Sequence, residues 1–467
     1  MNEIQYIGEH LLPGQIGRFA IVLAFVASIL AAVSYFFAEK NSNNATAAGW
    51  RRIGRGAFIT HGLSIFTVIG ILLYIMYNRF YEYQYVQLQV EDTLPMRYIL
   101  SSFWAAQEGS FLLWMFWHIV LGFVLIKIAK SWESSVLAIL SVIQIFLSSM
   151  ILGIYVSGVK IGINPLLLLR DVIDAPIFEQ ADYVSKLTGN GLNPLLQNYW
   201  MTIHPPTLFL GFASTAIPFC YAVAGLWNGR HKDMLQASLP WALFNGAILG
   251  IGILMGGAWA YEALTFGGYW AWDPVENTSL VPWIILIAGI HTHLVARATG
   301  HSIKTTYLFY ILAFVFIIFS TFMTRSGILG DSSVHSFTEM GLETQLLIFL
   351  SFFTIAPLII FFVKQKTIPT HTDEEPTPSK EFWMFIGSLV LIFSAALITV
   401  STSLPIYNNI KAFLDPTFDI KLQGLVIDDP VDHHNKYQLW IGVFIGCLLY
   451  TSPSPRDRTR SRMPSSA

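Results

Sequence analysis

The stretch GGYWAWDPVENTSLVPWI, Gly267 to Ile284, guides the interpretation of the whole chain. Its aromatic residues stand immediately before an acid, a proline and a run of apolar residues. The order Asp273, Pro274 and Glu276 is typical of a helix start, with acid at the N-cap, proline at the first position and glutamate at the third. We therefore expect an apolar helix from about Pro274, preceded by an aromatic loop.

The composition is that of a membrane protein. Of 467 residues, 54% are hydrophobic and 12% are charged, about half the charged fraction of a soluble protein. Apolar runs of about twenty residues recur, each long enough to cross a bilayer as a helix. We expect an all-α, polytopic transmembrane helix bundle with about 10–11 spans. Ten spans are expected near residues 17–38, 56–77, 103–127, 135–157, 206–227, 239–258, 278–296, 305–323, 344–363 and 383–402, and an eleventh from about Tyr437.

The distribution of Lys and Arg predicts the orientation of these spans. Basic residues gather in every second connecting loop, for example at Arg51, Lys127, Lys130, Arg230 and Lys304. By the positive-inside rule these loops face the cytoplasm. The aromatic loop 259–277 and the long loops 158–205 and 403–436 then face outward. The net charge of -2 argues against a nucleic-acid partner.

Both ends of the chain carry simple expectations. The first residues lack the basic flank and cleavage site of a signal peptide.

The chain has two cysteines, Cys220 and Cys447, which cannot form a disulfide framework or a Cys-x-x-Cys site. We expect residues 1–446 to form one transmembrane domain. Residues 447–467 are basic and Ser/Pro-rich, which indicates a non-native or disordered tail.

The aromatic loop suggests a binding surface. Trp270 and Trp272 are two residues apart, so in an extended loop they point to the same side. With Tyr269 and Trp259 they could form a flat apolar platform for a flat aromatic ligand. The alternative is an interfacial belt of Trp and Tyr, which membrane proteins commonly carry. The helix start at Asp273 would attract an anionic group, and haem propionates are one candidate.

Three histidines are candidate iron ligands. His204, in MTIHPPTLFLGF, and His335, in TRSGILGDSSVHSF, flank the aromatic loop on the same face. A pair of neutral imidazoles can supply both axial ligands of a haem, although single histidines in loops are more often hydrogen-bonded surface residues. His291 lies roughly 26 Å along the helix from Pro274, inside the bilayer, and would belong to a second site. His293 faces away from it, and His61 and His118 are interpreted as packing residues.

Several motifs together resemble one family. GGYWAWDPVENTSLVPW resembles the WWD motif of haem-handling proteins of cytochrome c maturation. IHPPTLFLGF, ILMGGAWAYEALTFGGYWAWDPVEN, IHTHL, TFMTRSGILGDSSVHSF and SSFWAAQEGSFLLW resemble the CcmF type, the haem lyase subunit of the bacterial multi-subunit system. The recognisable motifs cover about residues 60 to 340.

The resemblance implies roles for individual residues. His204 and His335 would ligate a transferable haem b over the WWD loop, and His291 would ligate a second, b-type haem in the membrane. The family's other transmembrane histidine has no clear match here, because His433 and His434 fall in an expected outer loop. The implied reaction adds two thiols of an apocytochrome to the two haem vinyl groups. The protein would act by positioning, with Glu108 and Glu262 as candidate acid–base groups.

The resemblance also implies partners and a location. We expect a haem chaperone as donor, an apocytochrome c, other membrane subunits of the maturation system and membrane lipids. The active face would be the outer face of the bacterial plasma membrane. Four alternatives stay open: a fused-type cytochrome c synthase, a haem exporter-like member, a transporter with a broken helix at GILMGGAW, and a haem-containing membrane oxidoreductase.

Overall fold

The computed structural model describes residues 5–263, 268–330, 333, 341–370, 379–418 and 423–451. Ten helices in this part of the chain are long and apolar enough to cross a membrane, which confirms the predicted all-α, multi-pass architecture. They are α1 (Leu11–Lys40), α2 (Thr46–Tyr77), α5 (Gln107–Ile128), α6 (Glu133–Ser149), α7 (Tyr199–Asn228), α8 (His231–Ala263), α9 (Pro274–Thr299), α10 (Ile303–Arg325), α11 (Glu343–Lys364) and α12 (Lys380–Thr402).

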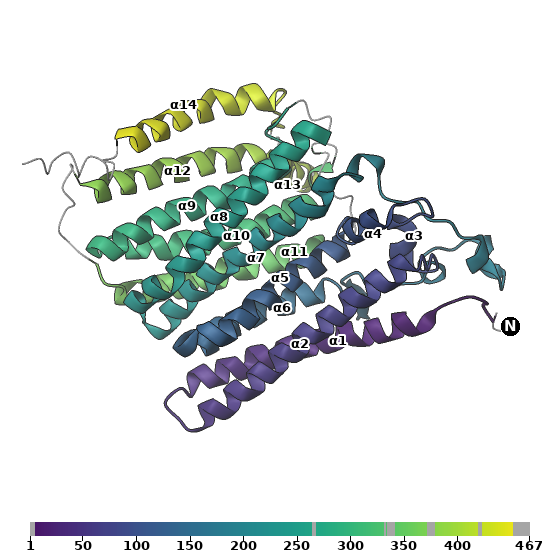
Figure 1. The fold of residues 1–467 in the computed structure, drawn as a ribbon. Helices are drawn as coiled ribbons and strands as arrows, with labels where there is room; N and C mark the ends of the chain where they lie inside the picture. Colours follow the sequence, from purple (N-terminus) through teal and green to yellow (C-terminus); the bar gives the residue numbers. More distant parts are fainter. Residues whose placement is uncertain are drawn as a thin grey trace, which may run out of the picture.

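The long helices run side by side, broadly in the order of the chain (Figure 1). The α1–α2 pair forms one edge of the bundle, and α12 and α14 (Pro430–Thr451) form the other. The short helices α3 (Gln84–Gln89) and α4 (Met96–Ser102) lie at one end of the bundle. The same end carries a hairpin of β1 (Ile154–Val156) and β2 (Val159–Ile161), with Tyr155 opposite Lys160.

The predicted span at 135–157 is too long at its end. Helix α6 stops at Ser149, and the apolar residues after it enter the β hairpin. The hairpin turn holds Ser157 at φ 51° and Gly158 at φ 82°. This left-handed pair is incompatible with a continuing helix, so the apolar character of Ile154 and Val156 misled the prediction.

The start of α7 also differs from the prediction. The helix begins at Tyr199, where the Asn198 side chain accepts a hydrogen bond from the Met201 amide, so His204 is helical and does not end a loop. Pro205 lies inside the helix and cannot donate to the Met201 carbonyl. The indole Nε1 of Trp104 donates to that carbonyl instead, at 2.8 Å. The turn between α4 and α5 thus satisfies the backbone group that the proline leaves open.

Helices α7 and α8 approach closely at glycines. A Cβ atom on Gly211 would lie 2.8 Å from the Leu249 Cα, and one on Gly252 would lie 3.0 Å from the Leu208 Cα. Small residues allow such close backbone contact between membrane helices. Helix α8 is continuous through GILMGGAW. The prediction of a broken helix there, on which the transporter alternative depended, is therefore wrong. The glycines there serve packing.

The segment 403–436 is more structured than a loop. It contains α13 (Leu404–Phe418) and the first residues of α14. His433 and His434 therefore lie in the first turns of a helix that starts seven residues before the predicted Tyr437. Helix α14 is not among the ten candidate spans. Residues 452–467 of the predicted tail lie outside the described residues.

His61 and His118 pack in the core, as predicted. Both are fully buried, and Gln144 on α6 links them: His61 Nε2 lies 3.0 Å from Gln144 Oε1, and His118 Nδ1 lies 2.9 Å from Gln144 Nε2. His61 Nδ1 also bonds the Ala24 carbonyl of α1 at 2.9 Å. This chain of hydrogen bonds ties α1, α2, α5 and α6 together and supports the wall behind α7.

Candidate functional site

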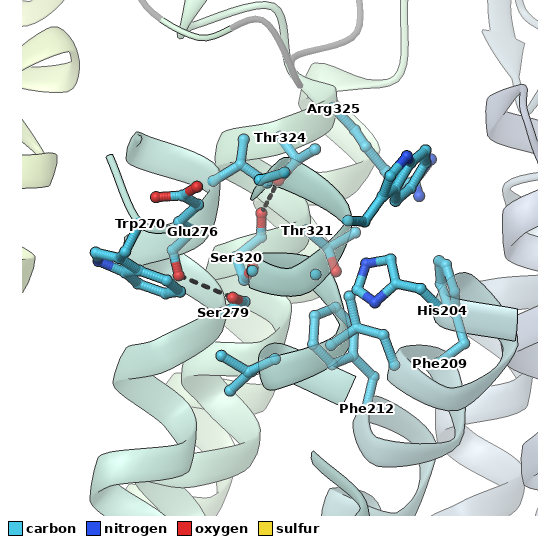
Figure 2. Close-up of a pocket in the computed structure, with 17 residues that line it drawn as sticks. His204, Phe209, Phe212, Trp270, Glu276, Ser279, Ser320, Thr321, Thr324 and Arg325 are labelled. Carbon is cyan, nitrogen blue, oxygen red and sulfur yellow. Dashed lines mark hydrogen bonds between the residues drawn. The ribbon is translucent and has the colours of Figure 1, made fainter. Parts of the chain in front are cut away.

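A pocket opens at the end of the bundle where α7 begins (Figure 2). Its empty space is about 920 Å³, counting the open mouth. Helices α7, α8, α9 and α10 all contribute side chains, and the lower wall is apolar, with Phe209 and Phe212. Trp270 and His204 lie on opposite sides of the pocket, with Ser320 and Thr321 of α10 between them (Figure 2). Two residues that the sequence analysis selected as candidate ligand-binding residues, His204 and Trp270, thus line one cavity.

The imidazole of His204 is held in a defined orientation. Its Nδ1 lies 3.0 Å from the Gly252 carbonyl oxygen of α8, so the ring carries its proton on Nδ1 and its lone pair on Nε2. The ring meets Trp259 edge to face, with centroids 5.7 Å apart. A Cβ atom on Gly256 would lie 3.0 Å from His204 Cε1. Two glycines of α8 therefore create both the space and the acceptor for this histidine. Neutral imidazole fixed through Nδ1 is the usual form of an iron or zinc ligand.

The tryptophans do not form one flat platform, so that part of the prediction is wrong. The rings of Trp270 and Trp272 lie at 89° to each other, with centroids 5.9 Å apart. Trp272 has φ 55°, which turns the chain and breaks the extended geometry assumed from the spacing. Trp270 and Trp259 line the pocket. Trp272 instead stacks on His434 of α14 at 4.8 Å and donates from Nε1 to Asn435.

Two indole donors in the pocket are orphaned. The buried Nε1 atoms of Trp259 and Trp270 have no hydrogen-bond partner among the described residues. Buried donors nearly always have a partner, so such atoms mark a place that a ligand or water completes. Tyr269 stands apart from them: it is 43% exposed, and its hydroxyl donates to the Leu254 carbonyl at 3.0 Å.

The start of α9 has the predicted cap. The Asp273 carboxylate accepts from the Val275 amide at 2.8 Å, and Glu276 accepts from the amides of Asp273 and Ala271, both at 3.1 Å. Ser333 also donates to Asp273 at 2.8 Å. The amides of this helix start are therefore used by its own carboxylates, whose charge disfavours a further anion there.

Arg325 supplies the positive charge of the pocket, and the sequence analysis missed it. It ends α10, is 7% exposed and lines the pocket near its mouth. Its guanidinium lies over the Phe111 ring of α5, with Cζ 4.9 Å from the centroid. A buried arginine beside an apolar cavity is suited to a carboxylate ligand. The signal was present: an arginine closing a membrane helix, in TRSG.

Other predicted site residues lie elsewhere. His335 lies outside the described residues. Glu262 accepts from the Tyr199 hydroxyl at 3.0 Å and from Trp200 Nε1 at 2.8 Å, and the described lining of the pocket does not include it. Glu108 is buried with its Oε2 lacking a hydrogen-bond partner in the described chain, and it lines a different pocket, together with Lys160.

His291 is separate from the pocket and differs from its neighbour. His293 is fully buried, and both of its nitrogens are hydrogen-bonded, to the Tyr310 hydroxyl at 2.7 Å and the Leu235 carbonyl at 2.6 Å. His291 Nδ1 is buried and has no hydrogen-bond partner in the described part of the chain. His293 therefore has a packing role, whereas His291 keeps a buried ring nitrogen without a hydrogen-bond partner among the described residues.

One protein-family model matches the part of the chain that forms the pocket. The family model described as Cytochrome C assembly protein matches residues 104–329, which contain every described residue that lines the pocket.

Curated relatives match over most of the chain. The cytochrome c-type biogenesis protein CcmF of Haemophilus influenzae is 30% identical over 84% of this chain and 57% of its own length. The CcmF of Pseudomonas aeruginosa is 32% identical over 83% of this chain and 55% of its own. The chain therefore spans a little more than half the length of the curated relatives it matches.

A solved structure shares the fold. The Cytochrome c Heme Lyase CcmF superposes with a TM-score of 0.64 and 23% identity, over 95% of this chain and 67% of that chain. The likeness to this structure concerns the fold. The family model and the curated relatives show that the chain belongs to the CcmF-type family of cytochrome c biogenesis proteins.

Proposed function

We propose that this chain acts in cytochrome c maturation as a haem lyase subunit. It holds haem in the pocket of His204 and presents it for thioether attachment to apocytochrome c, at the outer face of the bacterial plasma membrane. The observation that carries this proposal is the convergence of an oriented imidazole, two orphaned indole donors and a buried guanidinium on one apolar pocket. Imidazole suits iron, the aromatic wall suits a porphyrin face and the guanidinium suits a propionate.

Each residue has a distinct task in this proposal. His204 offers the Nε2 lone pair to the iron, and Trp270 and Trp259 contact the porphyrin. Arg325, rather than the capped start of α9, pairs with a propionate. Asp273 caps the start of α9 and thereby fixes the position of Trp270. Trp272 and Tyr269 hold the aromatic loop in place through their contacts with α14 and α8. His335 is the second histidine that would hold the haem iron.

The chain acts by positioning. Bound haem supplies two vinyl groups, to which two thiols of the apocytochrome add. The protein residues bind and orient the haem and exclude competing reactions. The proposed partners are a haem chaperone that donates the haem, the apocytochrome and other membrane subunits of the maturation system.

A second haem site is proposed at His291. This histidine lies on a membrane helix, and its Nδ1 lacks a partner within the described chain, whereas His293 is fully hydrogen-bonded. An ionisable residue at membrane depth with an unused nitrogen is a functional candidate. The site would hold a permanent b-type haem, distinct from the transferable one.

The test measures haem content and spectrum of purified protein for the variants His204→Ala, His335→Ala and His291→Ala. We expect the first two to lose the transferable haem and to keep their thermal unfolding temperature. His291→Ala should lose a separate b-type signal. His301→Ala is a matched control, because His301 lies between α9 and α10 at the opposite end of the bundle. Unchanged haem loading in both His204→Ala and His335→Ala would refute the proposal.

A further inference from the structure

A second large groove lies at the end of the bundle opposite His204. It is formed by the end of α5, the short 3-10 helix Lys130–Trp132, the end of α7 and the first half of α8. Its empty space is about 1570 Å³, counting the open side. Helix α7 begins beside the haem pocket and ends at this groove, so the whole length of a membrane helix separates them. We call it the α5–α8 groove.

One half of the α5–α8 groove is apolar and faces outward from the bundle. Val124, Ile128 and Phe244 line it and are 39%, 54% and 39% exposed. These residues belong to helices that cross the membrane, so their exposed surfaces meet hydrocarbon. This half is suited to an acyl chain.

The other half is a cationic rim at the helix ends. Arg230 is held rigidly: its Cζ lies 4.0 Å over the Trp132 ring, Nη2 donates to Ser131 Oγ at 3.0 Å, and Nε pairs with Asp233 at 3.2 Å. Lys130 is exposed, and the described residues provide no carboxylate within ion-pair distance of its ammonium group. Lys130 has φ 51°, and this left-handed residue ends α5 and brings Ser131 and Trp132 onto the rim.

The charges of the rim match a single phosphate diester. Lys130 and Arg230 are cationic, and Asp233 is the carboxylate among the lining residues, which leaves one net positive charge. A phosphate diester carries one negative charge, which the quaternary ammonium of phosphatidylcholine offsets and the headgroup of phosphatidylglycerol does not. The Ser131 hydroxyl and the Gln236 amide on the same rim offer further hydrogen bonds. Basic pockets between membrane helices with an adjoining apolar wall are typical sites for anionic lipid headgroups.

We propose that the α5–α8 groove binds an anionic phospholipid, with the phosphate at Lys130 and Arg230 and one acyl chain along Val124 and Ile128. A neutral apolar ligand would fill the hydrocarbon half and leave the ammonium group of Lys130 without a partner. The proposal is independent of haem binding, because the two sites share no lining residue.

The experiment counts lipids bound to the intact chain by native mass spectrometry after delipidation. Phosphatidylglycerol and phosphatidylcholine are added separately at equal concentrations. We expect wild type to retain one phosphatidylglycerol in preference to phosphatidylcholine, and Lys130→Gln to lower that preference about fivefold. Arg230→Lys, which keeps the charge, should lower it less than Lys130→Gln.

Lys127→Gln is the matched control. Lys127 lies on the same helix, is exposed and is not among the described residues that line the groove, so its loss should leave the preference unchanged. Equal retention of the two lipids by wild type would overturn the proposal. So would an equal effect of Lys127→Gln and Lys130→Gln, because that would indicate a diffuse surface charge.

Discussion

At the scale of single residues, the orientation of His204 depends on its neighbours in α8. The Gly252 carbonyl accepts from Nδ1, and Gly256 leaves room for the ring. Neither glycine contributes a side chain, so their roles emerge only from the packing of α7 against α8. The sequence identified the histidine as a candidate, but the acceptor that fixes its tautomer could not be read from it.

Arg325 yields a prediction at the same scale. If its guanidinium pairs with a propionate, Arg325→Gln should weaken haem binding about tenfold, as expected for loss of a charged hydrogen bond in a buried setting. The measurement compares haem with its dimethyl ester, which lacks carboxylates. Wild type should prefer haem, and Arg325→Gln should bind both equally.

Arg325→Lys is the control for charge, and it should retain part of the preference. An Arg325→Gln protein that still discriminates between haem and the ester would place the propionates elsewhere.

At the scale of elements, the first turns of α14 close over the aromatic loop. His434 is 4% exposed and stacks on Trp272 with an interplanar angle of 17°. Burial, with repulsion from His433 as the smaller cause, lowers the pKa of the His434 imidazole from 6.5 to about 4. The docked start of α14 is therefore most stable when the His434 imidazole is neutral.

This shift predicts a pH dependence for α14. Because the pKa is lower when the ring is buried, the docked state has its full stability above pH 6.5 and loses stability as the pH falls toward 4. We expect amide hydrogen exchange at the start of α14, corrected for intrinsic rates, to rise across that window.

His434→Phe is the matched variant, because it keeps an aromatic ring against Trp272 and removes the titration. Its exchange should rise less than that of wild type between pH 6.5 and 4, because the His434 ring no longer contributes. A wild-type α14 that exchanges at the same corrected rate throughout would contradict the assignment.

At the scale of the whole molecule, the sequence predicted the number and kind of the membrane helices well. Ten apolar runs gave ten helices, because a membrane helix needs a continuous apolar segment of fixed length. Errors occurred where apolar residues serve another purpose, as in the β hairpin after α6, or where a cap outside the apolar run starts the helix, as Asn198 does for α7.

The candidate site was predicted less completely. Motif spacing identified His204, Trp259 and Trp270, all of which line the pocket. The common platform failed because one left-handed residue, Trp272, turned the second indole away. Arg325 was overlooked because a membrane helix commonly ends in a basic residue, and the direction of its side chain depends on its contact with Phe111 of α5.

The orientation of the bundle yields a prediction for the whole molecule. In a Cys447→Ser background, where buried Cys220 remains, single cysteines at Ser157 and Asn44 report on opposite ends. A membrane-impermeant maleimide added to intact cells should label Ser157→Cys, in the β hairpin, and spare Asn44→Cys. Permeabilised cells should show labelling of both, as the control. The reverse pattern would place the pocket lined by His204 on the cytoplasmic side.

The succession of helices across the bundle has a consequence for biosynthesis. Because α7 to α10 are consecutive in the chain and pack on one another, the pocket lined by His204 is built from one uninterrupted portion of the nascent polypeptide. It acquires its last wall when α10 has left the ribosome, after α5 and α6 have already been made. Assembly of this cavity can therefore proceed in step with translation and does not have to wait for distant segments to be made.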